Sequence, residues 1–494
     1  MLSCNPRNYC FEYSREEINQ VIENNRLLTL EIEFSLRCNF HCQYCYTHDQ
    51  TSFEAELTKE EIKSVILQAE ELGVKKIIIL GGEPMAYQHS LEMIKFISDR
   101  GIKVEMFTNG FQITPEVAQQ LFDYEVHVVL KMNSFNENIQ DMLAGYKGAS
   151  KIIWEAFHNL QQAGYPSCEN PLSVSTIICK QNIDELLNMW QWLREQNIIP
   201  YFEMLTPQGR AKQNQWMNVD VRRVYDIFTE ISRIDHSNYG QSWDPQPPLV
   251  GNRCLRHQFS CLVNSQGFIL PCVGVPIQVG NIRERKLADI IKDSEVISDL
   301  RNYRKNIKGP CRNCEKLEVC YGCRGSAYQL TGDYLASDPL CWKNTNRQND
   351  IVYLPTPVDC IIPQQLPMLV IDRLEKVTER SGEISARISN HMLFVCEDGT
   401  LDEVAYLELI AQSGAALTGF KKLGVSNRMI DGMLLGANKL EIFGRAEIGD
   451  TLTISVFKYA RYGYFSILKG KVMRGDELLA QGEVKFWENK GANT

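Results

Sequence analysis

The chain has 494 residues, which is too long for one ordinary domain, so we expect two or three. Hydrophobic residues make up 44% and charged residues 23% of the sequence, which is typical of a globular protein and unlike a disordered chain. The formal net charge of -9 argues against nucleic acid as a partner, because nucleic acid needs a concentrated basic surface. No apolar run approaches the roughly 20 residues of a membrane span, so we expect no membrane partner.

The 17 cysteines are placed unevenly along the chain. Their number is odd and no charged-then-apolar leader opens the sequence, so we expect a cytoplasmic protein without a disulfide framework. One group occupies residues 38–45, and a second runs from Cys254 to Cys341. Thiolates grouped at such short intervals in a reducing compartment usually bind metal. We expect the other six, at positions 4, 10, 168, 179, 360 and 396, to be structural residues.

Short apolar segments alternate with longer helical patterns from about residue 28 to residue 205. The predicted strands are Leu28–Phe34, Lys76–Leu80, Lys103–Thr108, His127–Met132, Leu172–Cys179 and Ile198–Met204. The predicted helices between them are Thr58–Leu72, Ser90–Asp99, Pro115–Phe122, Ala149–Ala163 and Ile183–Gln196. Repeated strand–helix units predict a parallel sheet with helices outside it. Six units are fewer than the eight of a full barrel, so the expected α/β fold is a partial (β/α)6 barrel.

A loop with C-x3-C-x2-C spacing, formed by Cys38, Cys42 and Cys45, follows the first predicted strand. Parallel α/β folds place their ligand loops at this end of the strands. Three thiolates can bind three irons of a [4Fe–4S] cluster and leave the fourth iron without a protein ligand. A zinc site is the alternative, but zinc sites normally close with four ligands, and His41 is crowded beside Cys42 as a fourth.

This loop resembles the signature of the radical S-adenosylmethionine (SAM) superfamily, and the resemblance covers residues 28–205. In that family the open iron chelates the amino and carboxylate groups of SAM. The aromatic residue before the third cysteine, here Tyr44, lies near the adenine. The turn Gly81-Gly82-Glu83-Pro84 after the second strand resembles the family turn whose backbone meets the SAM amino group. Glycine allows the main chain to make such a close approach.

Two further strand ends resemble positions that face SAM in this family. Thr108-Asn109-Gly110 ends the third strand and resembles the family's Thr-Asn-Gly turn. Lys131, Asn133 and Ser134 follow the fourth strand, where they could face SAM or make only local hydrogen bonds. The resemblance implies that the residues binding the cofactor SAM are Tyr44, Gly81, Gly82, Glu83, Pro84, Asn109 and Ser134. It also implies an electron donor such as flavodoxin or ferredoxin.

The second cysteine group has eight members, Cys254, Cys261, Cys272, Cys311, Cys314, Cys320, Cys323 and Cys341. Eight thiolates are enough for two fully ligated clusters, with two zinc ribbons as the alternative. The spacing, with a Gly267-x4-Cys272 element, resembles the SPASM extension of radical SAM enzymes. That resemblance implies one auxiliary [4Fe–4S] cluster on Cys254, Cys261, Cys272 and Cys323, and another on Cys311, Cys314, Cys320 and Cys341. The family usually has three residues where Tyr321-Gly322 provides two.

The pattern changes after about residue 367, where long alternating strands surround one apolar helix, Asp402–Lys421. This arrangement suggests an α+β hotdog fold, in which a curved antiparallel sheet wraps a helix. The segments Pro363–Asp372 and Tyr406–Gln412 resemble β-hydroxyacyl-acyl carrier protein dehydratase-like proteins. Glu408 matches the acid of that family, but its catalytic histidine is absent, and Val395–Gly399 stands in its place. The resemblance therefore implies acyl-thioester binding or dimerisation, with leucines and isoleucines of the helix lining a tunnel, more than dehydration.

These observations predict a radical SAM core at 1–245, a SPASM domain at 246–350 and a hotdog domain at 360–494. The resemblances imply an iron–sulfur oxidoreductase that uses three [4Fe–4S] clusters and SAM to abstract a hydrogen atom. We expect a small or acyl-carrier-bound substrate presented by the hotdog domain, which could also form a homodimer. A peptide maturase is the alternative, although no leader-binding module precedes the core. A third alternative is that the hotdog domain serves only as a scaffold for dimerisation. Catalytic residues remain unknown, with Glu408 as a weak candidate.

Overall fold

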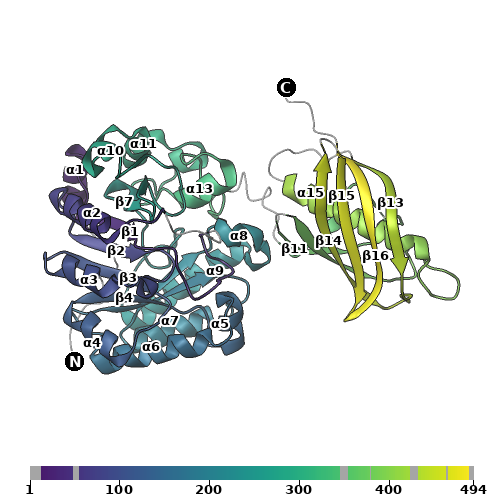
Figure 1. Ribbon diagram of the computed structural model, residues 1–494, viewed down its shortest axis with the longest axis horizontal. Coiled ribbons are helices and arrows are strands. Elements are labelled where there is room, and N and C mark those ends of the chain that lie inside the picture. Colours follow the sequence, from purple (N-terminus) through teal and green to yellow (C-terminus); the bar gives the residue numbers. More distant parts are fainter. Residues whose placement is uncertain are drawn as a thin grey trace. The chain divides into compact units, whose positions relative to one another are not determined.

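The computed structural model describes residues 13–47, 55–344, 354–365, 367–378, 380–422, 432–462 and 465–488. The chain divides into two compact units (Figure 1). The first consists of Met1–Ala211 and Val219–Thr345, and the second of Lys212–Asn218 and Asn346–Thr494. Among the described residues, no helix combines the length and the apolar character that a membrane crossing requires.

Six parallel strands form the main part of the sheet in the first unit. They are β1 (Thr29–Glu33), β2 (Lys76–Leu80), β3 (Lys103–Thr108), β4 (Val126–Lys131), β5 (Leu172–Ile178) and β6 (Ile199–Met204). Their order is β6-β5-β4-β3-β2-β1, so each strand lies beside the strand that precedes it in the chain. The predicted partial barrel is confirmed, and each strand begins and ends within about one residue of its predicted bounds.

Helices connect these strands on the outside of the sheet (Figure 1). Those at predicted positions are α2 (Lys59–Glu71), α3 (Ser90–Ser98), α4 (Pro115–Asp123), α6 (Ala149–Ala163) and α7 (Leu186–Glu195). Those that were not predicted are α1 (Arg15–Glu23), α5 (Glu137–Ala144), α8 (Gly209–Gln213) and α9 (Val221–Tyr239), with the short 3-10 turn η1 (Pro84–Ala86). The 3-10 turn η2 (Gln215–Met217) belongs to the second unit.

The cysteine-rich segment extends the same sheet. β7 (Ser260–Val263) pairs in parallel with β1, and β8 (Phe268–Leu270) and β9 (Gly280–Asn281) follow in antiparallel pairing. The remaining elements are η3 (Arg256–Gln258), α10 (Leu287–Asp293), α11 (Glu295–Arg301), α12 (Tyr303–Asn306), η4 (Gly309–Asn313) and α13 (Arg324–Thr331). The predicted core and SPASM regions therefore share one continuous sheet.

β1 shows why polar groups gather inside this sheet. Leu30 and Ile32 point into the apolar core that the helices cover. Thr29, Glu31 and Glu33 alternate with them and are buried on the opposite face. Burial of both faces is usual in parallel sheets. Buried carboxylates need hydrogen-bond or charge partners, so the inner face is where polar chemistry can be organised.

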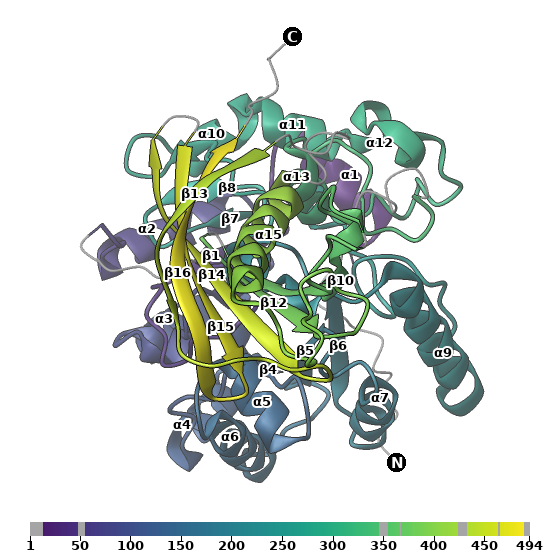
Figure 2. The ribbon, with the colours of Figure 1, turned by 90° about the vertical axis from the view of Figure 1, so that its right-hand side faces the viewer.

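The second unit is a seven-stranded antiparallel sheet that curves around one helix, α15 (Glu403–Lys422) (Figure 2). The strand order is β10-β11-β12-β14-β15-β16-β13. The bounds are β10 (Thr356–Pro357), β11 (Arg373–Val377), β12 (Ser381–Arg387), β13 (Gly432–Ile442), β14 (Thr451–Tyr462), β15 (Phe465–Arg474) and β16 (Glu477–Glu488), with the turn η5 (Val358–Cys360). The predicted hotdog fold is confirmed.

The helix packs directly on the sheet of this unit because a glycine stands opposite it. A Cβ atom on Gly470 of β15 would lie 2.4 Å from the side chain of Ile410 on α15. Leu409, Ile410 and Leu417 are buried in the core between helix and sheet. These residues were predicted, with Leu407, to line an acyl tunnel, and at Gly470 the side chain of Ile410 fills that space.

One of the six remaining cysteines differs from expectation. Cys168 is disulfide-bonded, whereas the sequence indicated a protein without a disulfide framework. Cys179 is buried and free, as expected of a small core residue, whereas Cys396 is exposed. The side chains of Cys4, Cys10 and Cys360 lie outside the described residues.

Candidate active site

The loop that carries Cys38, Cys42 and Cys45 leaves the carboxyl end of β1 and is held by backbone contacts on two sides. On one side, the N–H of His41 donates to Ala144 O at 3.0 Å at the end of α5. Gly145 ends that helix in the left-handed region, φ 60°, and a Cβ atom there would lie 2.3 Å from His41 O. The loop can therefore approach α5 only because this position is glycine.

The other side of the loop rests on the start of α8. The N–H of Arg210 donates to Cys45 O at 2.8 Å. Gly209 has φ 53°, and a Cβ atom on it would lie 2.3 Å from the same oxygen. Segments more than 160 residues away in sequence thus fix the position of the third cysteine.

The three cysteines line one cavity of about 520 Å³ at the carboxyl ends of the parallel strands. Strand-end residues that share its wall are Gly81, Gly82, Glu83, Thr108, Asn109, Lys131, Ser175 and Glu203. A cavity of this size is in the range that small-molecule ligands occupy. The parallel sheet thus brings the predicted strand-end residues together at one cavity.

The thiols in this cavity suit a metal cluster more than free cysteine chemistry. Burial raises the pKa of Cys38 to about 11 and that of Cys42 to about 12. Without metal the neutral thiol is favoured, and binding of iron must displace the proton. Within the described residues, no three metal-ligating side chains converge as ligands of a single ion do. In a cuboidal cluster each thiolate binds a different iron, so the donor set fits a cluster.

The Gly81-Gly82 turn brings the end of β2 against the cysteine loop. The N–H groups of Gly82 and Glu83 donate to Ser35 O at 2.9 Å and Arg37 O at 2.7 Å. Cβ atoms on Gly81 and Gly82 would lie 2.4 Å from Ser35 O and 2.2 Å from Arg37 O. Besides any approach to a ligand, the glycines are therefore required for contact with the loop itself.

Glu83 joins two strand ends under this turn. Its carboxylate accepts hydrogen bonds from the Thr108 hydroxyl at 2.7 Å, the Asn109 N–H at 2.7 Å and the Met85 N–H at 3.1 Å. The side chain is buried, and burial raises its pKa to about 7. Its observed role is to tie β2 to β3, while Pro84 begins η1.

Two neighbouring strand ends contact the cysteine loop, Asn109 after β3 and Asn133 after β4, the latter through Tyr44 of the loop. The Asn109 amide donates to Asn39 Oδ1 at 2.9 Å and lies 3.7 Å from Cys38 Sγ. The Tyr44 hydroxyl accepts from the Asn133 amide at 2.7 Å, and Lys131 Nζ lies 5.3 Å from the centre of its ring. Ser134 is buried and donates to Glu185 at 2.8 Å, and it is not among the residues that line the cavity.

Sequence reasoning missed a buried ion pair at the far wall of the cavity. Arg256 donates to both carboxylate oxygens of Glu31 at 3.2 Å and to the Tyr201 hydroxyl at 3.4 Å. All three residues line the cavity. Glu31 lies within a strand that is otherwise apolar enough to be buried, and a buried carboxylate needs a hydrogen-bond or charge partner. This residue was therefore the signal in the sequence for a buried ion pair.

The structure separates the second cysteine group into two sets. Burial raises the pKa of Cys272 to about 12, and the thiolates of Cys323 and Cys254 add to the increase. The first set consists of Cys254, Cys272 and Cys323, and Cys323 lies close to the cavity, since its Sγ is 3.9 Å from Thr206 of the cavity wall. The backbones of Gly274 and Gly325 pack together beside Cys272 and Cys323.

The second set consists of Cys311, Cys314, Cys320 and Cys341. Burial raises the pKa of Cys320 to about 11, and the charges of Cys311 and Cys314 contribute. Burial likewise raises the pKa of Cys341, with contributions from Cys311 and Cys320. Cys320 and Cys323, which belong to different sets, are separated only by Tyr321 and Gly322.

Cys261 lies apart from the residues it was expected to join. It is on β7 in the apolar core, paired with Leu30 of β1. The charges that act on its thiol, besides burial, are Arg301 on α11 and Glu31. The structure therefore brings together seven of the eight cysteines of this group, in one set of three and one of four.

Buried side-chain nitrogens beside the first set lack hydrogen-bond acceptors among the described residues, so they suit a bound group that is rich in acceptors. His257 contacts Tyr321 through Nδ1 at 2.9 Å, but its Nε2 has no hydrogen-bond partner in the part of the chain that the structure describes. Nε and Nη2 of Arg324 are also buried without a partner among these residues. The sulfides of an iron–sulfur cluster accept N–H hydrogen bonds.

Comparison with known proteins agrees with this geometry. Residues 32–193 match the radical SAM superfamily, and residues 254–315 match the iron–sulfur cluster-binding SPASM domain. The first unit is a radical SAM enzyme. Residues 356–494 match the ApeP dehydratase family, so the chain joins this enzyme to a dehydratase-like hotdog domain.

Curated relatives of the radical SAM unit differ in what they make. An AdoMet-dependent heme synthase of Methanosarcina barkeri is 28% identical over 335 residues, which are 63% of this chain and 94% of the relative. A PqqA peptide cyclase of Bradyrhizobium diazoefficiens is 27% identical, over 64% of this chain and 86% of the relative. The crystal structure of Streptococcus suis SuiB bound to S-adenosylmethionine shares the fold, with 18% identity, a TM-score of 0.51 and coverage of 66% and 81%.

In the hotdog domain, Glu408 lies on α15 in a network of neutral groups. Its carboxylate accepts from the Gln412 amide at 2.8 Å. Gln412 also donates to Met368 O at 2.7 Å and accepts from the Val370 N–H at 3.0 Å. These contacts join the helix to the segment before β11. None of these three hydrogen bonds brings a basic side chain to Glu408.

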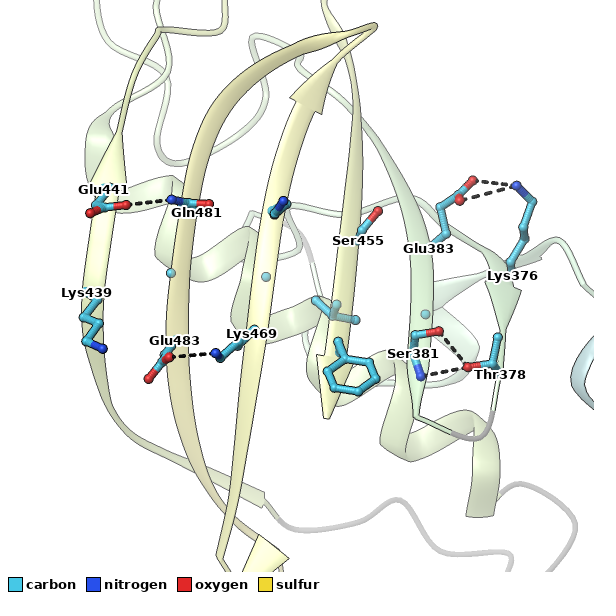
Figure 3. A pocket seen from close by; sticks show the side chains of 16 residues that line it. Lys376, Thr378, Ser381, Glu383, Lys439, Glu441, Ser455, Lys469, Gln481 and Glu483 are labelled. Atoms are coloured by element: carbon cyan, nitrogen blue, oxygen red, sulfur yellow. Dashed lines mark hydrogen bonds and ion pairs between the residues drawn. The ribbon is translucent and has the colours of Figure 1, made fainter. Parts of the chain in front are cut away.

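A second cavity, of about 600 Å³, lies across the strands on the face of the hotdog sheet opposite α15. Polar pairs between neighbouring strands line it (Figure 3). They are the ion pairs Lys376–Glu383 at 3.1 Å and Lys469–Glu483 at 3.4 Å, and the hydrogen bond from Gln481 to Glu441 at 2.7 Å. Its charged lining differs from the apolar tunnel that an acyl chain requires.

Proposed function

We propose that this chain is an oxidative radical SAM enzyme with three [4Fe–4S] clusters, acting on a small or acyl-carrier-bound substrate. The observation that carries the proposal is the shared cavity. Three cysteines line it at one end, and Thr206 at its wall contacts Cys323 of an auxiliary set. A substrate between them would lie near both the site of hydrogen abstraction and an electron acceptor.

Cys38, Cys42 and Cys45 would hold the cluster that binds SAM. When bound, this cluster and SAM supply a 5′-deoxyadenosyl radical. Tyr44, Gly81, Gly82, Glu83, Pro84, Asn109 and Ser134 are proposed to position SAM, five of them as residues of the cavity wall. Pro84 and Ser134 would act behind that wall, Ser134 through its hydrogen bond to Glu185.

The wall that faces the auxiliary cysteines is polar and fixed. Arg256 is held by Glu31 and Tyr201, so its guanidinium is oriented before any substrate arrives. Preorganised groups of this kind orient a bound molecule without further ordering cost. We propose that they orient the substrate carbon toward SAM, while the auxiliary clusters accept the electron that the substrate radical loses.

The hotdog domain is proposed to present an acyl-carrier-bound substrate without dehydrating it. Dehydration needs a base and an acid. Among the residues of this domain that the structure describes, the carboxylate of Glu408 accepts a hydrogen bond only from the Gln412 amide. Flavodoxin or ferredoxin as electron donor, a homodimer through the hotdog domain and a cytoplasmic location belong to the same proposal.

A ribosomal peptide as substrate is the second candidate. Relatives include the PqqA peptide cyclase and a mycofactocin maturase of Mycolicibacterium smegmatis that is 26% identical over 66% of this chain. Affinity purification of the full chain from its native host separates the candidates. Acyl carrier protein in the eluate supports the first, and a short precursor peptide supports the second.

The radical chemistry is tested by anaerobic reconstitution. The wild-type chain should bind roughly 12 iron atoms on the ligand counts of three clusters and release 5′-deoxyadenosine from SAM after reduction. Cys42→Ala should release none, because two thiolates cannot hold the open-iron cluster. Cys396→Ala, an exposed cysteine of the hotdog domain, is the control. About four iron with bound zinc would contradict the auxiliary clusters.

A further inference from the structure

Asp338 is a buried carboxylate that lies between the two sets of auxiliary cysteines. Its side chain is fully buried. One carboxylate oxygen accepts from the N–H of Cys323 at 2.8 Å, and the other accepts from the N–H of Leu340 at 2.9 Å. Cys323 belongs to the first set, and the next residue after Leu340 is Cys341 of the second. The Asp338 side chain therefore joins the chain segments that carry both.

The bridge between the two sets is shaped around this carboxylate. Gly322, between Cys320 and Cys323, has φ 66°, and a Cβ atom on it would lie 2.5 Å from the Cβ of Asp338. Only glycine allows Tyr321-Gly322 to pass so close to the aspartate. Two residues suffice here because the chain makes this turn directly over Asp338.

The charge of Asp338 reaches thiols of both sets. Its carboxylate contacts the N–H of Cys323 in the first set and the N–H of Leu340, the residue before Cys341, in the second. The turn from Cys320 to Cys323 passes directly over its Cβ. Its pKa is raised by burial, and the two N–H donors and the nearby guanidinium of Arg324 oppose that shift. Arg324 is itself anchored through Nη1 to Tyr334 O at 3.1 Å and Ala336 O at 2.6 Å.

A buried carboxylate beside the ligands of a cluster disfavours an added electron on that cluster, because the electron adds negative charge next to it. Net charge and hydrogen bonding around a cluster are among the main determinants of its reduction potential. In this buried setting, the charge is screened little by solvent.

We propose that Asp338 is a positioning residue that holds both auxiliary clusters at low reduction potential, with Arg324 as its countercharge. The inference rests on the proposed auxiliary clusters. Because one carboxylate acts on both sets, it lowers the two potentials together.

The test is a redox titration of the anaerobically reconstituted full chain, followed by electron paramagnetic resonance. Asp338→Asn keeps an oxygen acceptor for Cys323 but removes the charge, so the auxiliary midpoints should become more positive. Arg324→Gln removes the countercharge, so they should become more negative. Asp333→Asn is the matched control, because this aspartate accepts from the Leu335 N–H at 2.9 Å in the same segment but faces Lys308 at the surface. Its midpoints should equal those of the wild type.

Iron content is measured first. A wild-type chain with only about four iron would refute the proposed clusters themselves, before any variant is compared. With clusters present, an Asp338→Asn midpoint equal to that of Asp333→Asn overturns the inference, as do shifts of the same sign in Asp338→Asn and Arg324→Gln. If either Asp338→Asn or Arg324→Gln binds less iron than the wild type, the midpoint of the other variant is compared with that of Asp333→Asn and decides the inference.

Discussion

Replacing Gly82 with alanine would test whether the end of β2 positions the cysteine loop. An added Cβ would lie 2.2 Å from Arg37 O, 2.5 Å from Leu36 O and 2.6 Å from the carbonyl carbon of Arg37. These are backbone atoms of the segment directly before Cys38, and they cannot rotate away as a side chain can. Restoring an ordinary contact requires a shift of about 1 Å in that segment.

Such a shift should change the free energy of unfolding moderately and the rate of SAM cleavage strongly. Overpacking of this kind costs about 1–3 kcal/mol of unfolding free energy. A displacement of about 1 Å in groups that position reactants can lower the rate about 100-fold. We therefore expect Gly82→Ala to fold and to release 5′-deoxyadenosine from SAM about 100-fold more slowly than the wild type.

Gly101→Ala is the matched control for this change. Gly101 has φ 71° but no atom within 4 Å of an added Cβ, so alanine there would cost about 1–2 kcal/mol through backbone strain alone. Release of 5′-deoxyadenosine is measured by chromatography after anaerobic reduction, with denaturant unfolding of both variants. If Gly82→Ala cleaves SAM as fast as Gly101→Ala, the reasoning about the loop is refuted.

Three other outcomes follow from the same contacts. Cys341→Ala should spare 5′-deoxyadenosine release but impair product formation, and equal loss of both would contradict separate roles for the clusters. Burial raises the pKa of Glu83 to about 7, so between its unfolded value near 4.5 and about 7 this group lowers stability as pH rises. Glu83→Gln should remove about 3 kcal/mol of that pH dependence, and denaturant unfolding at several pH values would show no difference if the reasoning fails. The full chain should bind β-hydroxyacyl-acyl carrier protein without forming enoyl product, and product that disappears in Glu408→Gln would refute a non-catalytic domain.

Local spacing explains what could be predicted at the first cluster. Cys38, Cys42 and Cys45 lie on one short loop, so their sequence separation limits their distance in space. The strand ends at Gly81 and Asn109 could be grouped with them because parallel strands present their carboxyl ends at one edge. α9 was missed although its sequence carries a local signal, since apolar residues from Val221 to Ile231 recur at helical spacing after the N-cap Asp220. Its partner is remote, since Asp235 on α9 accepts from Trp190 on α7 at 2.7 Å.

The sequence by itself determined the elements whose signals are local, namely the six strands, the cysteine loop and the alternating strands around α15. Only the tertiary structure decided how the cysteines from Cys254 to Cys341 divide into two sets, because eight thiols can be grouped in several ways. Cys261 has the spacing of a ligand, but strand alternation turns it into the apolar core beside Leu30. The Glu31–Arg256 pair and the place of Asp338 likewise depend on chain crossings over long sequence separations. Burial and charge act through space, and spacing along the chain does not report them.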